Sequence, residues 1–150
     1  MEDNEIRQLV SNILMADNDL LNMLSPDNVN WSKPEANAKK NRKNSIMPMA
    51  NYDYPKMAMP IITIQVGDSM LVDYHLVETV IYIRCYNSSQ KSYYDISKIL
   101  DRVVKNLHRK QFALNQSRFV ELIWQMTSME AFDEAYKLPF REARFILNRV

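Results

Sequence analysis

The segment from residue 77 to residue 107 changes its hydrophobic period from two to about 3.6, and this change most constrains the fold. Residues 77–86 alternate as a strand does, and residues 93–107 repeat as an amphipathic helix does. The apolar strand face comprises Thr79, Ile81, Ile83 and Cys85, and the helical stripe comprises Ile96, Ile99, Leu100, Val103, Val104 and Leu107. These two apolar surfaces predict a helix that covers a sheet.

Weaker patterns on either side predict the other elements. Residues 4–16 are amphipathic, and Asp19 is a candidate cap for a short helical turn that follows. Gly67 and Asp68 are expected to end the strand that begins at Pro60, and residues 128–137 are expected to form a charged loop. The predicted strands are residues 60–66, 77–86, 118–126 and 139–149.

Together these elements predict one α+β domain over residues 1–150. We expect a small, mainly antiparallel four-stranded sheet with helices packed on one face, in the order α-β-β-α-β-β. A long arm at about residues 25–58 has no hydrophobic periodicity and contains prolines, asparagines and a basic cluster, which is Lys39, Lys40, Arg42 and Lys43.

Few residues in the chain are typical of catalytic or metal sites. The histidines, His75 and His108, are far apart in sequence, and Cys85 lies on the apolar face of a predicted strand. No cysteine and histidine spacing is typical of a metal site, and a single glycine disfavours a phosphate-binding loop. We therefore expect no enzymatic activity, no catalytic or metal-binding residues and no cofactor.

Charge and composition favour a protein of the reducing cytosol. The net charge of +1 implies no strong general attraction to nucleic acid or membrane, and one cysteine allows no internal disulfide. The acidic start, MEDNEIRQLV, lacks the order of a signal peptide, and no apolar run approaches the roughly 20 residues that cross a bilayer. We expect no membrane contact.

Tyrosines and methionines are the residues that we interpret as assembly contacts, because both are common where a surface packs against a partner. On the mixed face of the strand at 77–86 and at the start of the next helix, the candidates are Tyr82, Arg84, Tyr86 and Tyr93. In the arm, the candidates are Met47, Met49, Tyr52, Tyr54, Met57 and Met59. The same tyrosines, with Tyr94, could instead stack on single-stranded nucleic acid, with the basic arm cluster on its phosphates.

The chain resembles the tail terminator and tail completion proteins of long-tailed bacteriophages. The segments that carry the resemblance are IRQLVSNILMADNDLLNML, PIITIQVGD, TVIYIRCYNSSQKSYYDISKILDRVVKNL, RFVELIWQM and KLPFREARFILNRV. The resemblance implies a small α+β protein, without catalytic residues, that forms a ring, typically a hexamer, at the head-proximal end of the tail. It implies a virion protein, made in the host cytoplasm, that contacts the tail tube protein, the head–tail connector or neck, and in some cases the sheath, with DNA only as passing cargo.

Two other functions remain open at this point. Another neck or head-completion ring protein would have similar features. A small nucleic-acid-binding module, using Lys39, Lys40, Arg42 and Lys43, is the alternative from a different class, and its affinity would fall steeply with salt.

Overall fold

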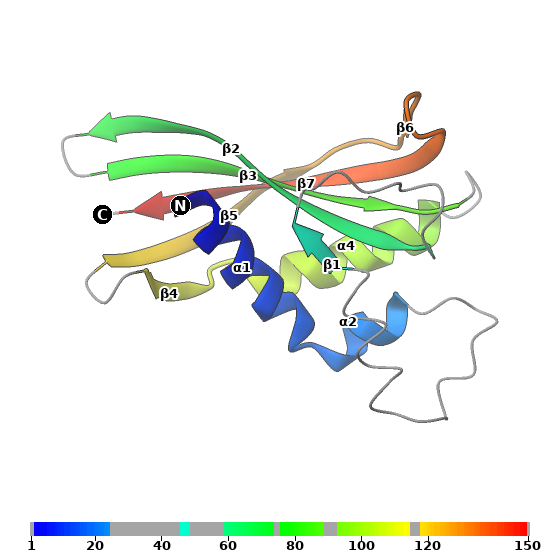
Figure 1. The fold of residues 1–150 in the computed structure, drawn as a ribbon, viewed down its shortest axis with the longest axis horizontal. Helices are drawn as coiled ribbons and strands as arrows, with labels where there is room; N and C mark the ends of the chain where they lie inside the picture. Colours follow the sequence, from blue (N-terminus) through cyan, green and yellow to red (C-terminus); the bar gives the residue numbers. More distant parts are fainter. Residues whose placement is uncertain are drawn as a thin grey trace.

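A computed structural model describes residues 2–24, 46–48, 59–73, 76–88, 93–114 and 118–149 (Figure 1). The helices in these ranges are α1 (Glu2–Met15), α2 (Asn18–Met23) and α4 (Tyr93–Leu107). The strands are β1 (Ile46–Pro48), β2 (Ile61–Asp73), β3 (Leu76–Tyr86), β4 (Gln111–Leu114), β5 (Arg118–Thr127), β6 (Ala131–Asp133) and β7 (Leu138–Arg149). Within this part of the chain, no helix is both long enough and apolar enough to span a bilayer.

The strands form one curled sheet in the order β1-β2-β3-β7-β5-β4, with β6 paired to β7 beside this path. Among the described strands, only β1 is parallel to its neighbour, and the other six pair with one another in antiparallel fashion. The predicted four-stranded sheet with helices packed on one face is therefore wrong, because the described chain is mostly strand and its sheet is larger and curled. The predicted strands at 77–86, 118–126 and 139–149 correspond to β3, β5 and β7.

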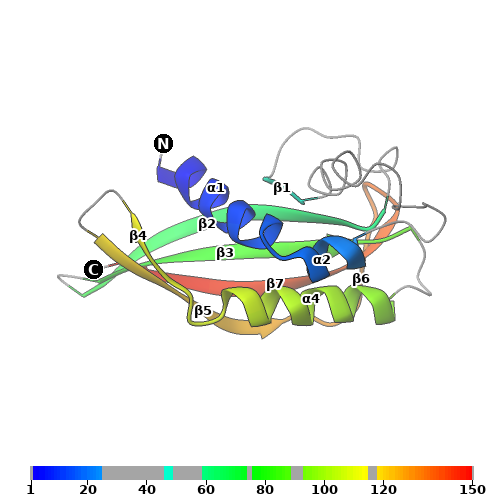
Figure 2. The same ribbon diagram turned by 90° about the horizontal axis from the view of Figure 1, so that it is seen from below.

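The main hydrophobic core fills the inner face of the sheet, which we define as the face that carries Ile83. Alternate residues of β3 and β7, including Phe145, are completely buried there, as the period of two predicts. The α4 helix packs on β7, β3 and β5, whereas α1 packs on β2 and β1. Figure 2 shows α1 lying obliquely over the β2 side of the sheet, α4 lying along its β7 side, and α2 between the two helices. Each large apolar side chain buried in this way contributes about 1.5–3 kcal/mol.

The first two helices are joined by an acidic residue that differs from the predicted cap. Asp17, not Asp19, is the N-cap of α2, and its carboxylate accepts a hydrogen bond from the Asp19 backbone at 3.1 Å. Arg102 of α4 donates two hydrogen bonds to Asp17, at 2.6 and 3.0 Å, and Asn106 donates a third at 2.6 Å. These three hydrogen bonds, led by those of Arg102, hold the pKa of Asp17 far below its usual range, although burial acts in the opposite direction. The cap thus connects α2 to α4.

The β2 strand continues beyond the predicted end at Gly67 and Asp68 and runs to Asp73. The register between β2 and β3 shifts between Val66 and Ser69, so a bulge accommodates the glycine within the strand. The Ser69 and Thr79 hydroxyl oxygens lie 2.7 Å apart and share a hydrogen bond, which ties the two strands together beyond the bulge. The prediction failed because glycine in a strand can mark either an end or a bulge.

The segment predicted as a charged loop, residues 128–137, instead contains β6 followed by a tight turn. Asp133 accepts hydrogen bonds from the backbone nitrogens of Ala135 and Tyr136, at 2.9 and 3.1 Å. Lys137 then takes a left-handed backbone conformation, with φ of 58°, before β7 begins. This short hairpin lies at one end of the sheet, far from the turn between β2 and β3 (Figure 1).

Candidate assembly surfaces

The predicted contact residues of β3 lie on the outer face of the sheet, opposite the main core. Cross-strand neighbours on this face belong to β2, β3 and β7, and the rows are Gln65–Tyr82–Arg144, Thr63–Arg84–Glu142 and Ile61–Tyr86–Phe140. Tyr82 and Arg84 are half-buried, and the Arg144 guanidinium lies 5.2 Å from the centre of the Tyr82 ring. The outer face is thus a packed layer of aromatic and charged side chains.

Arg84 is held by several groups at the centre of this layer. Its Nε donates to Glu142 Oε1 at 2.8 Å, Nη1 donates to the Tyr86 hydroxyl at 3.2 Å, and the guanidinium lies 4.6 Å from the centre of the Phe140 ring. Burial alone would lower the pKa of Arg84. The hydrogen bonds to Glu142 and Tyr86 raise this pKa by more than burial lowers it, so the net shift is upward. Arg84 therefore stabilises this chain internally as a permanent cation.

Tyr86 and Tyr93 also make contacts within the chain. Tyr86, a candidate assembly contact on the mixed face, is buried with Ile61 and Leu138, and its hydroxyl donates to Asp133 at 3.3 Å. Burial raises the pKa of Tyr86 to about 12. Tyr93 is half-buried and donates to the Ala131 carbonyl at 2.6 Å, which fastens the start of α4 to β6. The structure brings Tyr82, Arg84 and Tyr86 together as predicted neighbours, but it does not test their contact with a partner.

The arm candidates are mostly outside the described residues. The candidates outside the described residues are Met49, Tyr52, Tyr54 and Met57. The basic cluster also lies outside them, and it comprises Lys39, Lys40, Arg42 and Lys43. Met47 belongs to β1, a short strand within the region predicted as an arm. This strand pairs with β2. Met59 is half-buried and packs on the small cluster that contains Ile61 and Tyr86. Their roles in assembly stay predictions.

Cys85 and His108 are the described residues whose side chains were considered for chemistry. Cys85 is completely buried in the main core, as its place on the apolar strand face predicts, and burial raises the pKa of its thiol strongly. His108 is exposed, and its Nδ1 accepts a hydrogen bond from the Trp124 backbone nitrogen at 3.0 Å. His75 lies outside the described residues. Among the residues that the structure describes, no group of acidic, histidine and cysteine side chains could hold a metal ion.

A first exposed apolar surface lies on the hairpin of β2 and β3. Met70 and Leu71 are each 67% exposed, and Val72, which follows directly, is 51% exposed. Met70 pairs with Glu78 and Leu71 with Val77, so both sheet faces of the hairpin carry apolar side chains. We call Asp68, Met70, Leu71, Val72 and Glu78 the hairpin surface.

A second surface lies at the corner between α4 and β5. Trp124 is 39% exposed, and its indole nitrogen donates to Thr127 at 3.1 Å. The turn after α4 is joined to the same strand, because the Arg109 backbone nitrogen donates to the Leu122 carbonyl at 2.7 Å. We call Lys105, Arg109, Lys110 and Trp124, all exposed, the corner surface.

Arg109 of the corner surface has an unfavourable backbone conformation. Its φ is 62°, in the left-handed region, at a position after a helix where glycine is most common. This conformation costs a residue with a side chain about 1–2 kcal/mol. Such strain is often kept where the side chain has a function.

A third surface surrounds β6. Met129 is 81% exposed and Phe132 is 37% exposed. Two exposed carboxylates, Glu130 and Glu134, lie beside them in sequence. We call these four residues the β6 surface. Figure 1 shows β6 at the opposite end of the sheet from the turn of the hairpin.

These three surfaces differ from the candidates that sequence reasoning chose. The run Met70-Leu71-Val72 after the lone glycine was a usable signal, but it was missed because the strand was expected to end at Gly67. The basic residues Arg109 and Lys110, at the end of the predicted helix, were not chosen as contact candidates. No protein-family model matches the chain, and no curated protein matches its sequence.

Proposed function

We propose that this chain is a structural virion protein, a tail terminator that forms a ring on the head-proximal end of a phage tail tube and joins the tail to the head connector. The resemblance of its sequence to that family supports the proposal. The ring would work by shape, because it would cover the last ring of the tube protein and present a new surface to the connector.

The observation that carries the proposal is the separation of the exposed apolar side chains over different edges of the sheet. The hairpin surface lies mainly on β2, which is near one edge, whereas the corner surface lies by β4, which is the other edge. A contact between two unlike patches is heterologous, and repeated heterologous contacts close into rings when the rotation permits. Exposed apolar patches on a chain of this size are typical of protein–protein contact.

Native mass spectrometry over a concentration series tests this proposal. The result expected is a monomer at low concentration and a discrete ring-sized oligomer, favoured as a hexamer, at higher concentration. A monomer at every concentration would contradict self-driven ring formation.

Binding of the protein to purified phage components tests where in the virion the ring is located. A tail terminator should bind assembled tail tubes and stop their elongation. Another neck or head-completion ring protein should bind the connector and leave tube elongation unchanged. The two results distinguish the proposed function from its nearest alternative.

A further inference from the structure

Resting on the proposed ring, we propose that the hairpin surface of one copy docks on the corner surface of the next copy. The contact would place the apolar end of the hairpin against Trp124, and its acidic residues against the basic turn that follows α4. The occupant of each surface is thus a second copy of this chain.

Charge complementarity is the first argument for this pairing. Residues 68–78 contain three acidic residues and no lysine or arginine, whereas residues 105–110 contain three lysines or arginines and no acidic residue. Asp68, Lys105, Arg109 and Lys110 are exposed, so these charges are available to a partner. Complementary surface charges speed association and fix the orientation of the two partners.

The acidic groups near the corner surface do not cancel its positive charge. Glu121 is half-buried, and its carboxylate accepts a hydrogen bond from Gln111 at 3.3 Å. Asp101 lies one helical turn before Lys105, on the exposed side of α4. The corner surface carries three cations, Lys105, Arg109 and Lys110, and these two carboxylates are the acidic groups beside it in the chain, so the local charge stays positive.

Charge also argues against the β6 surface as the acceptor. Residues 128–137 contain three acidic residues and one lysine, so an acidic hairpin would meet like charge there. A hairpin docked on the hairpin of another copy would likewise bring Asp68 and Glu78 against their own counterparts. The corner surface is the apolar surface, among the three described, that has the opposite sign.

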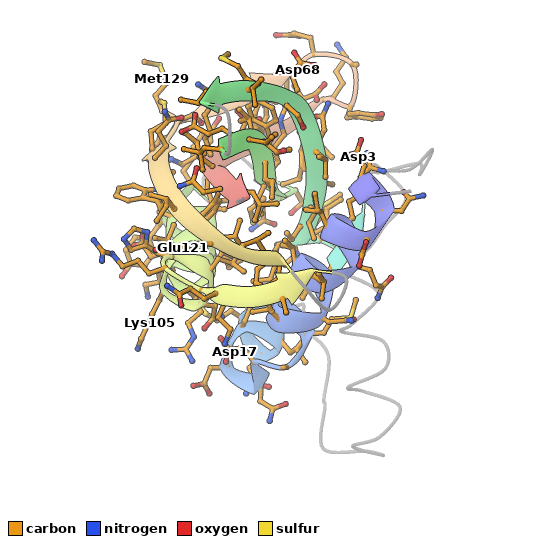
Figure 3. All side chains as sticks on the ribbon, turned by 90° about the vertical axis from the view of Figure 1, so that its left-hand side faces the viewer. Asp3, Asp17, Asp68, Lys105, Glu121 and Met129 are labelled. Atoms are coloured by element: carbon orange, nitrogen blue, oxygen red, sulfur yellow. The ribbon has the colours of Figure 1, made fainter. Side chains whose placement is uncertain are left out.

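Geometry makes the contact heterologous. The two surfaces lie on different edges of the sheet, and the labelled Asp68 and Lys105 lie on different sides of the molecule in Figure 3. A copy that offers its hairpin to one neighbour therefore keeps its corner surface for another neighbour. This arrangement propagates in one direction, as a ring requires.

Charge-reversal variants test the pairing. The hairpin variant is Asp68→Lys/Glu78→Lys, and the corner variant is Arg109→Glu/Lys110→Glu. Each variant alone should stay folded, by circular dichroism and thermal melting, while its assembly midpoint in native mass spectrometry rises by about a hundredfold in concentration. The matched control, Glu130→Lys/Glu134→Lys, changes the same number of charges on the β6 surface and should assemble like the wild type.

An equimolar mixture of the two defective variants gives the decisive measurement. Each variant keeps one native surface, so mixed oligomers that contain both masses should form at concentrations where neither variant assembles alone. Folded variants that fail to form mixed oligomers would overturn the pairing.

Three other outcomes would also overturn the pairing. If the wild type assembles and both variants assemble equally well, the ring proposal stands but these surfaces do not form it. If the β6 control loses assembly while the corner variant keeps it, the acceptor is the β6 surface. A wild type that stays monomeric contradicts the ring and this contact together.

Discussion

Tyr82 lies so close to Gly67 that a Cβ added at position 67 would be 2.8 Å from Tyr82 Cε2 and 3.2 Å from the Val80 carbonyl oxygen. The lone glycine of the chain therefore lets the ring of Tyr82 lie over the bulge of β2. Because the apolar residues of the hairpin surface follow this bulge directly, the close approach helps to set where they project. Tyr82, which was chosen from the sequence as a candidate contact, thus helps to shape the chain around the bulge.

Gly67→Ala should destabilise the monomer by about 1 kcal/mol, because the steric cost of overpacking exceeds the entropy gained in the unfolded chain. Urea unfolding measures this change. In a Tyr82→Ala background the same substitution should lose most of its cost, since the 2.8 Å contact is gone. Equal costs in the two backgrounds would show that Tyr82 does not limit the space at position 67.

Glu142→Ala should destabilise the chain by about 1–2 kcal/mol, because it leaves the half-buried Arg84 cation without its carboxylate partner. Glu142→Gln keeps an acceptor oxygen and should cost less. Both are measured by urea unfolding at neutral pH. A change below about 0.5 kcal/mol for Glu142→Ala would mean that the pair behaves as an ordinary solvated surface ion pair.

Acid should weaken the fold in part through Asp17. Its pKa is lower in the folded chain than the ordinary value of 3.8, chiefly through the hydrogen bonds from Arg102, so its ionised form stabilises the fold. This stability is present above the unfolded pKa of 3.8 and is lost as the pH falls below it toward the lower folded pKa. Urea unfolding near pH 7 and near pH 3 measures the loss.

Two matched variants check the origin of that acid sensitivity. Asp17→Asn removes the carboxylate, and Arg102→Gln removes the cation that holds it. Each should be less stable than the wild type at neutral pH and should lose less stability on acidification. An unchanged acid sensitivity in both variants would assign it to other carboxylates.

Arg109→Gly should stabilise the monomer by about 0.5–1 kcal/mol, because glycine relieves the left-handed conformation but gains freedom in the unfolded chain. Arg109→Ala keeps the conformational cost and should bring no such gain. Both variants lack the guanidinium and should assemble more weakly than the wild type. A more stable Arg109→Gly variant that assembles normally would remove Arg109 from the contact.

The elements with long, regular patterns were predicted well from the sequence. The apolar stripe of α4 and the alternation of β3 and β7 each extend over many residues, so the periods were unambiguous. The strands β4 and β6, with four and three residues, are too short to show a period, and tertiary pairing alone defines them. Each therefore escaped prediction, and the size of the sheet was underestimated.

The candidate surfaces were less predictable than the fold. Alternation places Tyr86 on the outer face correctly, but it cannot show that Leu138 and Phe140 of a distant strand bury it. Conversely, Met70 and Leu71 have the composition of a buried strand, yet both are largely exposed beyond the bulge in the β2–β3 hairpin. Burial depends on neighbours from other strands, which a single sequence does not specify.

Electron microscopy of the purified wild-type protein, at concentrations where native mass spectrometry finds the oligomer, tests the central claim most directly. The account predicts closed rings with a central opening and a constant number of copies. Compact two-fold dimers, open filaments or isolated monomers would contradict it, because none of them caps the end of a tube.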